Sequence, residues 1–299
     1  MDNQEFKSYQ EEITDKIQAE YHGENLIRTP IEQLYFYYKK EPTDMLATVY
    51  EPSVCIILQG AKEVGLGDEL IPYDPDKYLL ASVHMPARVR IAEASPQKPY
   101  VGLTVAFTME QIFDVLKDLS SKPNHTGTSK SGLYFGEMKK RLIEPITRLV
   151  RLLDSPEDIP ILSPLIIKEI LYTVMCDEGG DIIRQYVKNG SVEQRIVQAI
   201  TKIKDDYKTP LNIKELARSV SMSESSLYHN FKKITATSPL QFQKNLRLQE
   251  AKQLLMSQNI EAAQVAFEVG YESPSQFSRE YARMFGLPPI ADMQLNRNT

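Results

Sequence analysis

A stretch near the carboxyl end of the chain carries side chains that suit the recognition of DNA bases. In "PSQFSREYARMF", Gln276, Arg279 and Arg283 follow one another at spacings of three and four residues, which places them on one face of a helix. Arg can make two hydrogen bonds to the edge of guanine, and Gln can make two to adenine, in the major groove. The candidate DNA contacts on this helix are Ser275, Gln276, Arg279, Glu280 and Arg283.

The residues before this helix predict a helix end, a tight turn and an immediate restart. Gly270 can adopt a left-handed conformation at no steric cost. Ser273 offers an N-cap, Pro274 suits the first helical position, and Gln276 completes the pattern of a capping box. Two helices joined by such a turn form a helix-turn-helix unit, whose second helix can lie in the major groove.

The same pattern occurs about 50 residues earlier in the chain. Met222 corresponds to Tyr271 at an offset of 49, and Phe231 corresponds to Tyr281 at an offset of 50, so the second copy has one extra turn residue. Two aligned copies favour paired reading helices over a helical bundle with a solvated polar face. From the first copy and from the long helix between the copies, the candidate DNA contacts are Ser225, Ser226, Tyr228, His229, Lys232, Lys233 and Arg247.

The sequence holds no recognisable pattern of catalytic or metal-binding residues. Its four histidines, His22, His84, His125 and His229, lie outside metal-ligand spacing of one another. Neither a Ser/His/Asp constellation nor a GxxxxGKS phosphate loop is present. We therefore expect no enzyme activity, no catalytic residue, no metal and no cofactor.

Composition and charge indicate an ordinary globular protein with a basic carboxyl-terminal part. No apolar run approaches the ~18 residues of a membrane span, and the polar amino terminus does not predict a signal peptide. Cys55 and Cys176 are the two cysteines, so we expect a reducing, cytoplasmic location. From residue 191 onward there are 14 Lys and Arg against 11 Asp and Glu, whereas the preceding residues have 21 against 29. This asymmetry favours binding of a polyanion by the carboxyl-terminal part alone.

The pattern of elements predicts an α+β protein of several domains. Short apolar segments broken by Gly, Pro and Asp predict antiparallel strands up to residue 107, and "GLGDE" at 65–69 predicts a hairpin turn. After a polar loop at 120–132, apolar stripes at helical spacing suit either a dimer interface or packing on the strands. The expected divisions are an arm at 1–25, a β-barrel at 26–120, a loop and helical linker at 121–190, and a helical domain at 191–299 with helix-turn-helix units at about 212–234 and 260–285.

Residues 192–291 resemble the DNA-binding domain of bacterial AraC/XylS-type transcription regulators. The segments that carry the resemblance are "IKELA", "RLQEAKQLL", "VAFEVGY" and "SQFSREYARMFG". The resemblance implies two helix-turn-helix units that read successive major grooves, with Arg247 on a rigid spacer helix. The chain departs from the family pattern where His229 replaces a frequent Arg, Ala236 replaces a usual Gly, and Asp292-Met293 replaces a common Tyr-Arg pair.

The amino-terminal half resembles the corresponding domain of one AraC-like subgroup, through "YEPSVCIILQGAKEVGLGDE" and "LLDSPEDIPILSPLIIKEILY". This resemblance implies a cupin-like barrel that binds a small effector, mediates dimerisation, or does both. A thiolate at Cys55 could react with an electrophile, although an inert buried thiol is the alternative, and a structural role is the alternative for His84. The candidate effector-binding residues are Tyr50, Cys55, Gln59, Tyr78, His84 and Arg88.

These observations predict a transcription regulator that binds double-stranded promoter DNA and senses a small molecule. A homodimer, and contact with RNA polymerase if the protein is an activator, are further expected partners, whereas a membrane is not. One alternative is a cupin-type metal enzyme with an accessory DNA-binding domain, which metal analysis of the pure protein would distinguish. Another is an interaction protein whose helical repeat binds a protein partner.

Overall fold

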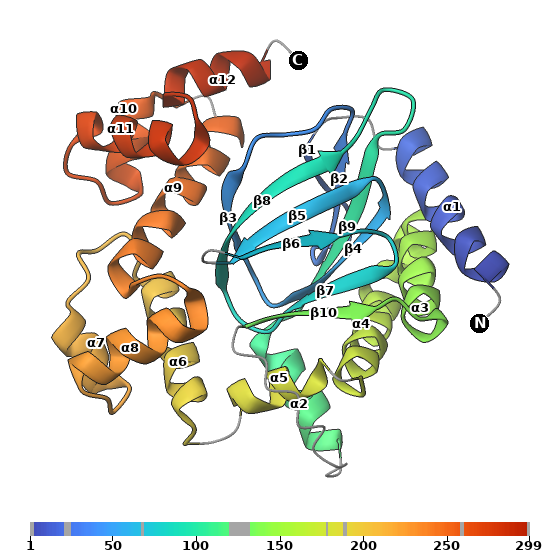
Figure 1. The fold of residues 1–299 in the computed structure, drawn as a ribbon, viewed down its shortest axis with the longest axis horizontal. Helices are drawn as coiled ribbons and strands as arrows, with labels where there is room; N and C mark the ends of the chain where they lie inside the picture. Colours follow the sequence, from blue (N-terminus) through green and yellow to red (C-terminus); the bar gives the residue numbers. More distant parts are fainter. Residues whose placement is uncertain are drawn as a thin grey trace. The chain divides into compact units, whose positions relative to one another are not determined.

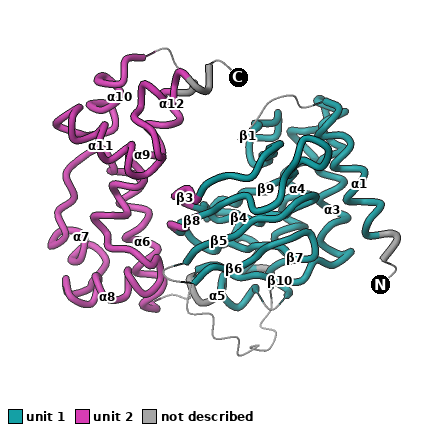
Figure 2. The backbone as a smooth tube through the Cα atoms, turned by 45° about the horizontal axis from the view of Figure 1, so that its top comes forward, with its two compact units in different colours: residues 1–44, 50–85, 89–188 teal, residues 45–49, 86–88, 189–299 magenta. Residues whose placement is uncertain are grey.

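The computed structural model describes residues 3–20, 25–66, 69–119, 132–177, 179–187, 190–257 and 260–297. Its Cα atoms divide the chain into two compact units (Figure 2). The first consists of residues 1–44, 50–85 and 89–188, and the second consists of residues 45–49, 86–88 and 189–299. Of the polar loop predicted at 120–132, only Gly132 lies among the described residues.

The strands in the described part of the chain form two sheets. The first has the order β1 (Asn25–Arg28), β2 (Leu34–Lys39), β9 (Tyr100–Ala106), β4 (Ser53–Gln59), β7 (Lys77–Ala81) and β10 (Leu133–Glu137). The second has the order β3 (Leu46–Tyr50), β8 (Met85–Glu93), β5 (Ala61–Leu66) and β6 (Glu69–Tyr73). β5 and β6 pair antiparallel with Leu66 opposite Glu69, so the hairpin predicted at 65–69 is confirmed.

Alternation along the strands gives the first sheet two different faces. Val54, Ile56 and Leu58 of β4 belong to a large apolar core that also contains Ile146 and Ile170 from helices. The helices of this part are α1 (Asn3–Glu20), α2 (Met109–Asp118), α3 (Lys140–Arg151), α4 (Ile159–Met175) and α5 (Gly180–Val187), with the short 3-10 turns Leu152–Asp154 and Pro156–Asp158. Figure 1 shows α1, α3 and α4 side by side against the sheet.

Residues 3–20, within the segment predicted as an amino-terminal arm, form a packed helix. Ile13 and Ile17 of α1 are completely buried in the apolar core. Arg151 of α3 donates from Nη2 to the Glu12 carboxylate at 2.6 Å. α1 is therefore fixed to the helices that follow the sheets.

From residue 190 onward, the described part of the carboxyl-terminal unit is helical, and the predicted α+β class is confirmed. Its helices are α6 (Val192–Asp205), α7 (Ile213–Ser219), α8 (Glu224–Thr235), α9 (Pro239–Ser257), α10 (Ala262–Glu268), α11 (Pro274–Phe285) and α12 (Pro289–Arg297). We call α7–α8 the first helix pair and α10–α11 the second helix pair.

The long helix α9 contributes to the cores of both pairs. Near its start, Phe242 packs edge-on against Phe231 of α8, with ring centroids 5.5 Å apart. Further along, Leu248, Ala251 and Leu255 belong to the apolar core of the second pair. α9 is therefore a shared structural element rather than a free linker.

Candidate functional site

The turns of the two helix pairs have matching backbone hydrogen bonds. The Met222 amide donates to the Ala217 carbonyl at 2.9 Å, and the Tyr271 amide donates to the Ala266 carbonyl at 2.9 Å. In both pairs the last turn of the first helix is therefore closed in the same way, at the offset of 49 that the sequence predicts.

Serine caps fix the start of each second helix. Ser223 Oγ accepts from the Ser226 amide at 3.2 Å, and Ser273 Oγ accepts from the Gln276 amide at 3.3 Å. These bonds satisfy amide groups that have no partner within the helix. The reciprocal half of the predicted capping box is not formed at Ser273, because the Gln276 side chain donates to Glu280 Oε1 at 3.3 Å instead.

The second helices have an apolar buried face and a polar exposed face, as their periodicity predicts. Leu227 and Phe231 of α8, and Phe277 and Tyr281 of α11, are at most 1% exposed. Ser226 is half-buried, and its Oγ accepts a hydrogen bond from Asn230. The exposed candidate contacts are Ser225, Tyr228, His229, Lys232 and Lys233 on α8, and Ser275, Gln276, Arg279 and Arg283 on α11.

Glu280, one of the predicted DNA contacts, is half-buried and interacts with other residues of the carboxyl-terminal helices. Its carboxylate forms an ion pair with Lys244 of α9 at 3.0 Å and accepts a hydrogen bond from the Tyr271 hydroxyl at 2.9 Å. Burial raises the pKa of Glu280, but hydrogen bonds from Lys244, Tyr271 and Gln276 outweigh it, so that the pKa is lowered. Glu280 links α9, the turn and α11.

Arg247, another predicted DNA contact, makes hydrogen bonds within the protein. Its guanidinium donates to the backbone carbonyls of Tyr207 at 2.6 Å, Lys208 at 3.2 Å, Thr209 at 2.9 Å and Gly270 at 2.7 Å. Burial lowers the pKa of Arg247. Because Arg has five N–H donors, these four bonds leave little of the group for a phosphate. The sequence could not predict this role, because the carbonyl groups that Arg247 binds belong to residues far from it in the chain.

A second candidate site lies between the two sheets. β4 directs Cys55 to the face opposite Val54 and Ile56, and Thr104 Oγ1 of β9 donates to Cys55 Sγ at 3.2 Å. From the second sheet, the Tyr73 hydroxyl donates to the Cys55 carbonyl. The residues whose side chains influence one another here, which we call the inter-sheet cluster, are Tyr37, Tyr50, Cys55, Lys62, Tyr73, Tyr100 and Thr104.

Of this cluster, the sequence predicted only Tyr50 and Cys55. Lys62 could have been found from its period-two spacing with the apolar Val64, which places both side chains on one face of β5. Val64 is completely buried. The sequence did not indicate which face of each strand lies between the sheets, and Tyr37, Tyr73 and Tyr100 were missed for the same reason.

Cys55 is a protonated thiol rather than an activated nucleophile. Burial raises its pKa, and this effect exceeds the lowering by Thr104, Lys62 and Ser53. The thiolate is the reactive form of cysteine. The structure therefore favours the inert alternative for Cys55.

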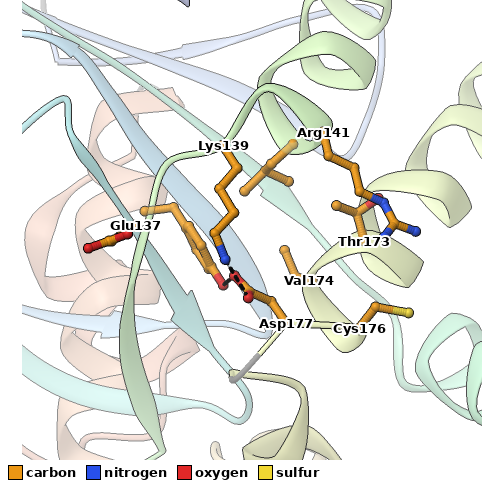
Figure 3. A pocket seen from close by; sticks show the side chains of 9 residues that line it. Glu137, Lys139, Arg141, Thr173, Val174, Cys176 and Asp177 are labelled. Carbon is orange, nitrogen blue, oxygen red and sulfur yellow. Dashed lines mark hydrogen bonds and ion pairs between the residues drawn. The ribbon is translucent and has the colours of Figure 1, made fainter. Parts of the chain in front are cut away.

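Tyr78 lies apart from the inter-sheet cluster, on the helix-covered face of the first sheet. Its hydroxyl donates to Asp177 Oδ2 at 3.1 Å, and it lines a hollow of about 120 Å³ with Thr173, Cys176 and residues of α3. Lys139 points toward Asp177 and pairs with it at 2.8 Å (Figure 3). Tyr78 and Asp177 thus join β7 to the end of α4.

The remaining predicted effector residues have separate positions. The Gln59 side-chain amide donates to the Pro99 carbonyl at 2.7 Å. His84 is half-buried between β7 and β8, and Arg88 is exposed on β8; each interacts with other residues of the protein.

The described residues contain neither a cluster of metal ligands nor a membrane-spanning helix. No group of three or more His, Cys, Asp or Glu side chains in these residues is arranged to hold a metal ion. In the same part of the chain, no helix has the length and apolar character needed to cross a bilayer.

Comparison with known proteins identifies related families for both parts of the chain. Residues 30–182 match the family described as AraC-type transcriptional regulator N-terminus, and residues 216–294 match the family described as helix-turn-helix domain. The lactose operon transcription activator of Staphylococcus xylosus is 25% identical over 80% of this chain and 82% of its own length. The transcriptional regulator ArgR of Pseudomonas aeruginosa is 30% identical, but the match spans only 44% of this chain and 40% of ArgR.

Solved structures of ToxT from Vibrio cholerae share the fold. An apo variant of ToxT gives a TM-score of 0.62 at 11% identity, covering 91% of this chain and 98% of ToxT. ToxT bound to an unsaturated fatty acid gives 0.60 at 10% identity, covering 86% and 94%. At this identity the similarity establishes the arrangement of the chain and nothing about its ligand.

Proposed function

The chain belongs to the AraC-type transcriptional regulators, and we propose that it binds promoter DNA through two helix-turn-helix units, the first and second helix pairs. The observation that carries this proposal is the equivalence of the two pairs. Each has the same closing hydrogen bond, a serine-capped second helix, and a polar face that is left exposed. A helical bundle that binds no common ligand through both pairs would not require the two pairs to be equivalent.

In this proposal the second helices α8 and α11 enter successive major grooves. Arg279 and Gln276 make base contacts, and Lys232, Lys233 and Arg283 meet phosphates or bases. His229 and Arg279 occupy equivalent positions at the offset of 50, so both pairs use this position to reach DNA. The further contacts are Ser225, Ser226, Tyr228 and Ser275.

The amino-terminal part in this proposal is a cupin-like barrel that binds a small-molecule effector. The polar inter-sheet cluster supports this, because an ordinary β-sandwich core is formed by apolar side chains from both sheets. ToxT, which has the same fold, binds an unsaturated fatty acid. Effector binding changes DNA binding only if the effector has unequal affinity for two states of the protein.

We also propose that the protein forms a homodimer and is not an enzyme. Ile161 and Leu165 of α4 are 70% and 61% exposed, an unusual position for large apolar side chains spaced by one helical turn. If the regulator is an activator, RNA polymerase is its further partner. Replacing both residues with Asp should convert a dimer to a monomer in sedimentation, whereas a monomeric wild-type protein would contradict dimerisation.

The DNA-binding proposal is tested by selecting random duplexes with the full-length protein at near-physiological salt. We expect an enriched motif with two elements about one helical turn, roughly 10 bp, apart. The same selection with Arg279→Ala should relax one element and preserve the other. The absence of enrichment, or identical motifs from both proteins, would contradict the proposed reading role of α11.

A further inference from the structure

Lys62 places an ammonium group in the space between the two sheets. It shares a face of β5 with the buried Val64 and lies opposite Tyr73 of β6, which is 2% exposed. The neighbouring Glu63 points to the other side of the strand, where its carboxylate pairs with Arg90 at 2.6 Å. The carboxylate nearest in sequence is therefore turned away from Lys62.

Two aromatic rings hold the Lys62 ammonium, and no carboxylate of the described residues neutralises it. Its Nζ lies 5.3 Å from the ring centroid of Tyr37 and 5.4 Å from that of Tyr100, which is within the range of cation–π contacts. Within the described part of the chain, Lys62 forms neither an ion pair nor a hydrogen bond, and no carboxylate acts on its pKa. A desolvated charge without a counter-charge is costly to a protein.

The groups around Lys62 are donors of hydrogen bonds. Burial raises the pKa values of Tyr37, Tyr50 and Tyr100, so their phenols remain protonated. Two of the hydroxyls in this region already have protein partners: that of Tyr73 donates to the Cys55 carbonyl, and that of Tyr37 is hydrogen-bonded with Thr104. A cation beside tyrosine side chains, whose hydroxyls can donate hydrogen bonds, suits an anion better than it suits a neutral or cationic molecule.

Lys62 and two of the neighbouring tyrosines are partly exposed to solvent. Desolvation lowers the pKa of Lys62 and raises those of Tyr37 and Tyr50, yet all three residues are only half-buried. Part of the surface of Lys62, Tyr37 and Tyr50 is therefore accessible in this region of the protein.

We propose that Lys62 binds the carboxylate of a small organic acid between the two sheets, an inference that rests on the effector role proposed above. The acid is short, because packed sheets lie only about 10 Å apart. Its apolar body contacts side chains on the inner face of β4, where Ile57 follows Cys55 at period two and is completely buried. The phenols of Tyr37, Tyr50 and Tyr100 supply the hydrogen bonds that accompany the ion pair.

The test compares each acid with its uncharged amide in thermal unfolding of the full-length protein. The probes are sodium benzoate and sodium hexanoate, with benzamide and hexanamide at equal concentration and ionic strength. We expect at least one acid to raise the unfolding midpoint by several degrees and its amide to have no such effect. If neither acid exceeds its amide in the wild-type protein, the inference is overturned.

Two variants locate the effect. Lys62→Met should abolish the shift caused by the acid, whereas the exposed control Lys98→Met should retain it. Without ligand, Lys62→Met should unfold at the same or a higher temperature than the wild type, since it removes an uncompensated charge. A persistent acid effect in Lys62→Met, or a large loss of ligand-free stability, would assign Lys62 a structural role instead.

DNA binding separates this inference from the function on which it rests. Wild-type protein that binds its selected duplex but does not respond to either acid leaves the regulator intact and removes only the carboxylate site. Protein that fails in both experiments contradicts the proposed function as well.

Discussion

The two helix pairs have the same architecture but differ in how their turns are held. At equivalent positions, Ser221 has φ 54° and Gly270 has φ 92°, and after the second helices Ala236 has φ 58° and Gly286 has φ 85°. The second pair thus uses Gly wherever the backbone is left-handed, whereas the first pair accepts residues with a side chain. Left-handed backbone costs a non-glycine residue about 1–2 kcal/mol, so the first pair stores strain that the second avoids.

The two turns also differ in the arginine hydrogen bonds that anchor them, and the second pair again has the better-supported turn. An arginine from the preceding helix reaches each turn: Arg195 Nη1 of α6 donates to the Ser221 carbonyl at 3.1 Å, and Arg247 Nη1 of α9 donates to the Gly270 carbonyl at 2.7 Å. Arg247 makes three further bonds to the 207–209 segment. The same backbone turn is thus anchored by more arginine hydrogen bonds in the second pair than in the first.

The largest expected effect comes from Gly270→Ala. A Cβ at Gly270 would lie 2.1 Å from the Lys208 carbonyl oxygen, so the segment that Arg247 holds would have to move. We expect a loss of roughly 4 kcal/mol in the free energy of unfolding of the carboxyl-terminal unit, measured by urea denaturation. Ser221→Ala, the matched change in the first pair, should be nearly neutral, and similar losses in both variants would contradict the asymmetry.

Arg247→Ala should have the next largest effect. Removing four charge-assisted bonds takes this donor from the carbonyls of the half-buried Tyr207 and Gly270 and should cost about 3 kcal/mol, whereas Arg195→Ala should cost about 1 kcal/mol. DNA affinity measured against salt concentration should retain its slope in Arg247→Ala. A slope reduced by about one would instead identify Arg247 as a phosphate contact.

For DNA binding, Arg279→Ala should weaken affinity for the selected duplex by about 1–3 kcal/mol and relax one base position. His229→Ala, at the equivalent position of the first pair, should have a smaller effect, because imidazole does not offer the paired donors of Arg to guanine. Titration of both variants against single-base mutants of the motif measures the difference. Equal weakening by Arg279→Ala on every sequence would make Arg279 a phosphate contact.

The Glu280 ion pair should make the stability of the second pair depend on pH. Because the pKa of Glu280 in the folded protein lies below its ordinary value of 4.5, its contribution is complete above that value and is lost as the pH falls through the lower one. Glu280→Gln should therefore be less stable than the wild type at pH 7 and approach it in acid. Glu224→Gln on the exposed start of α8 should not show this pattern in urea denaturation.

Ala236→Gly should have the smallest effect, and it should be stabilising. It relieves the left-handed strain at the end of α8 but increases the freedom of the unfolded chain, so we expect a gain of roughly 0.5–1 kcal/mol. Gly286→Ala in the second pair should lose about the same amount. A loss in both variants would show that Ala236 is not strained.

Local sequence patterns predicted the parts of the site that depend on neighbouring residues. Ser223 and Ser273 were identifiable as caps, and Phe231 and Tyr281 as buried residues, because caps and helical periodicity act within a few residues. The roles of Arg247 and Glu280 depend on partners 23 to 40 positions away, and no local pattern records such contacts. For Tyr78, the alternation of residues showed which neighbours share its face of the strand, but not whether that face lies between the two sheets or against the helices.

The position of α9 between the two cores limits which insertions and deletions this helix can accept. Its 19 residues carry Phe242 toward one core and Leu248, Ala251 and Leu255 toward the other. One residue inserted between these groups would rotate one pair relative to the other by about 100° and shift it by about 1.5 Å. Side chains on the surface of α9 can be exchanged without such a penalty, but a change in its length would turn the exposed faces of α8 and α11 in different directions.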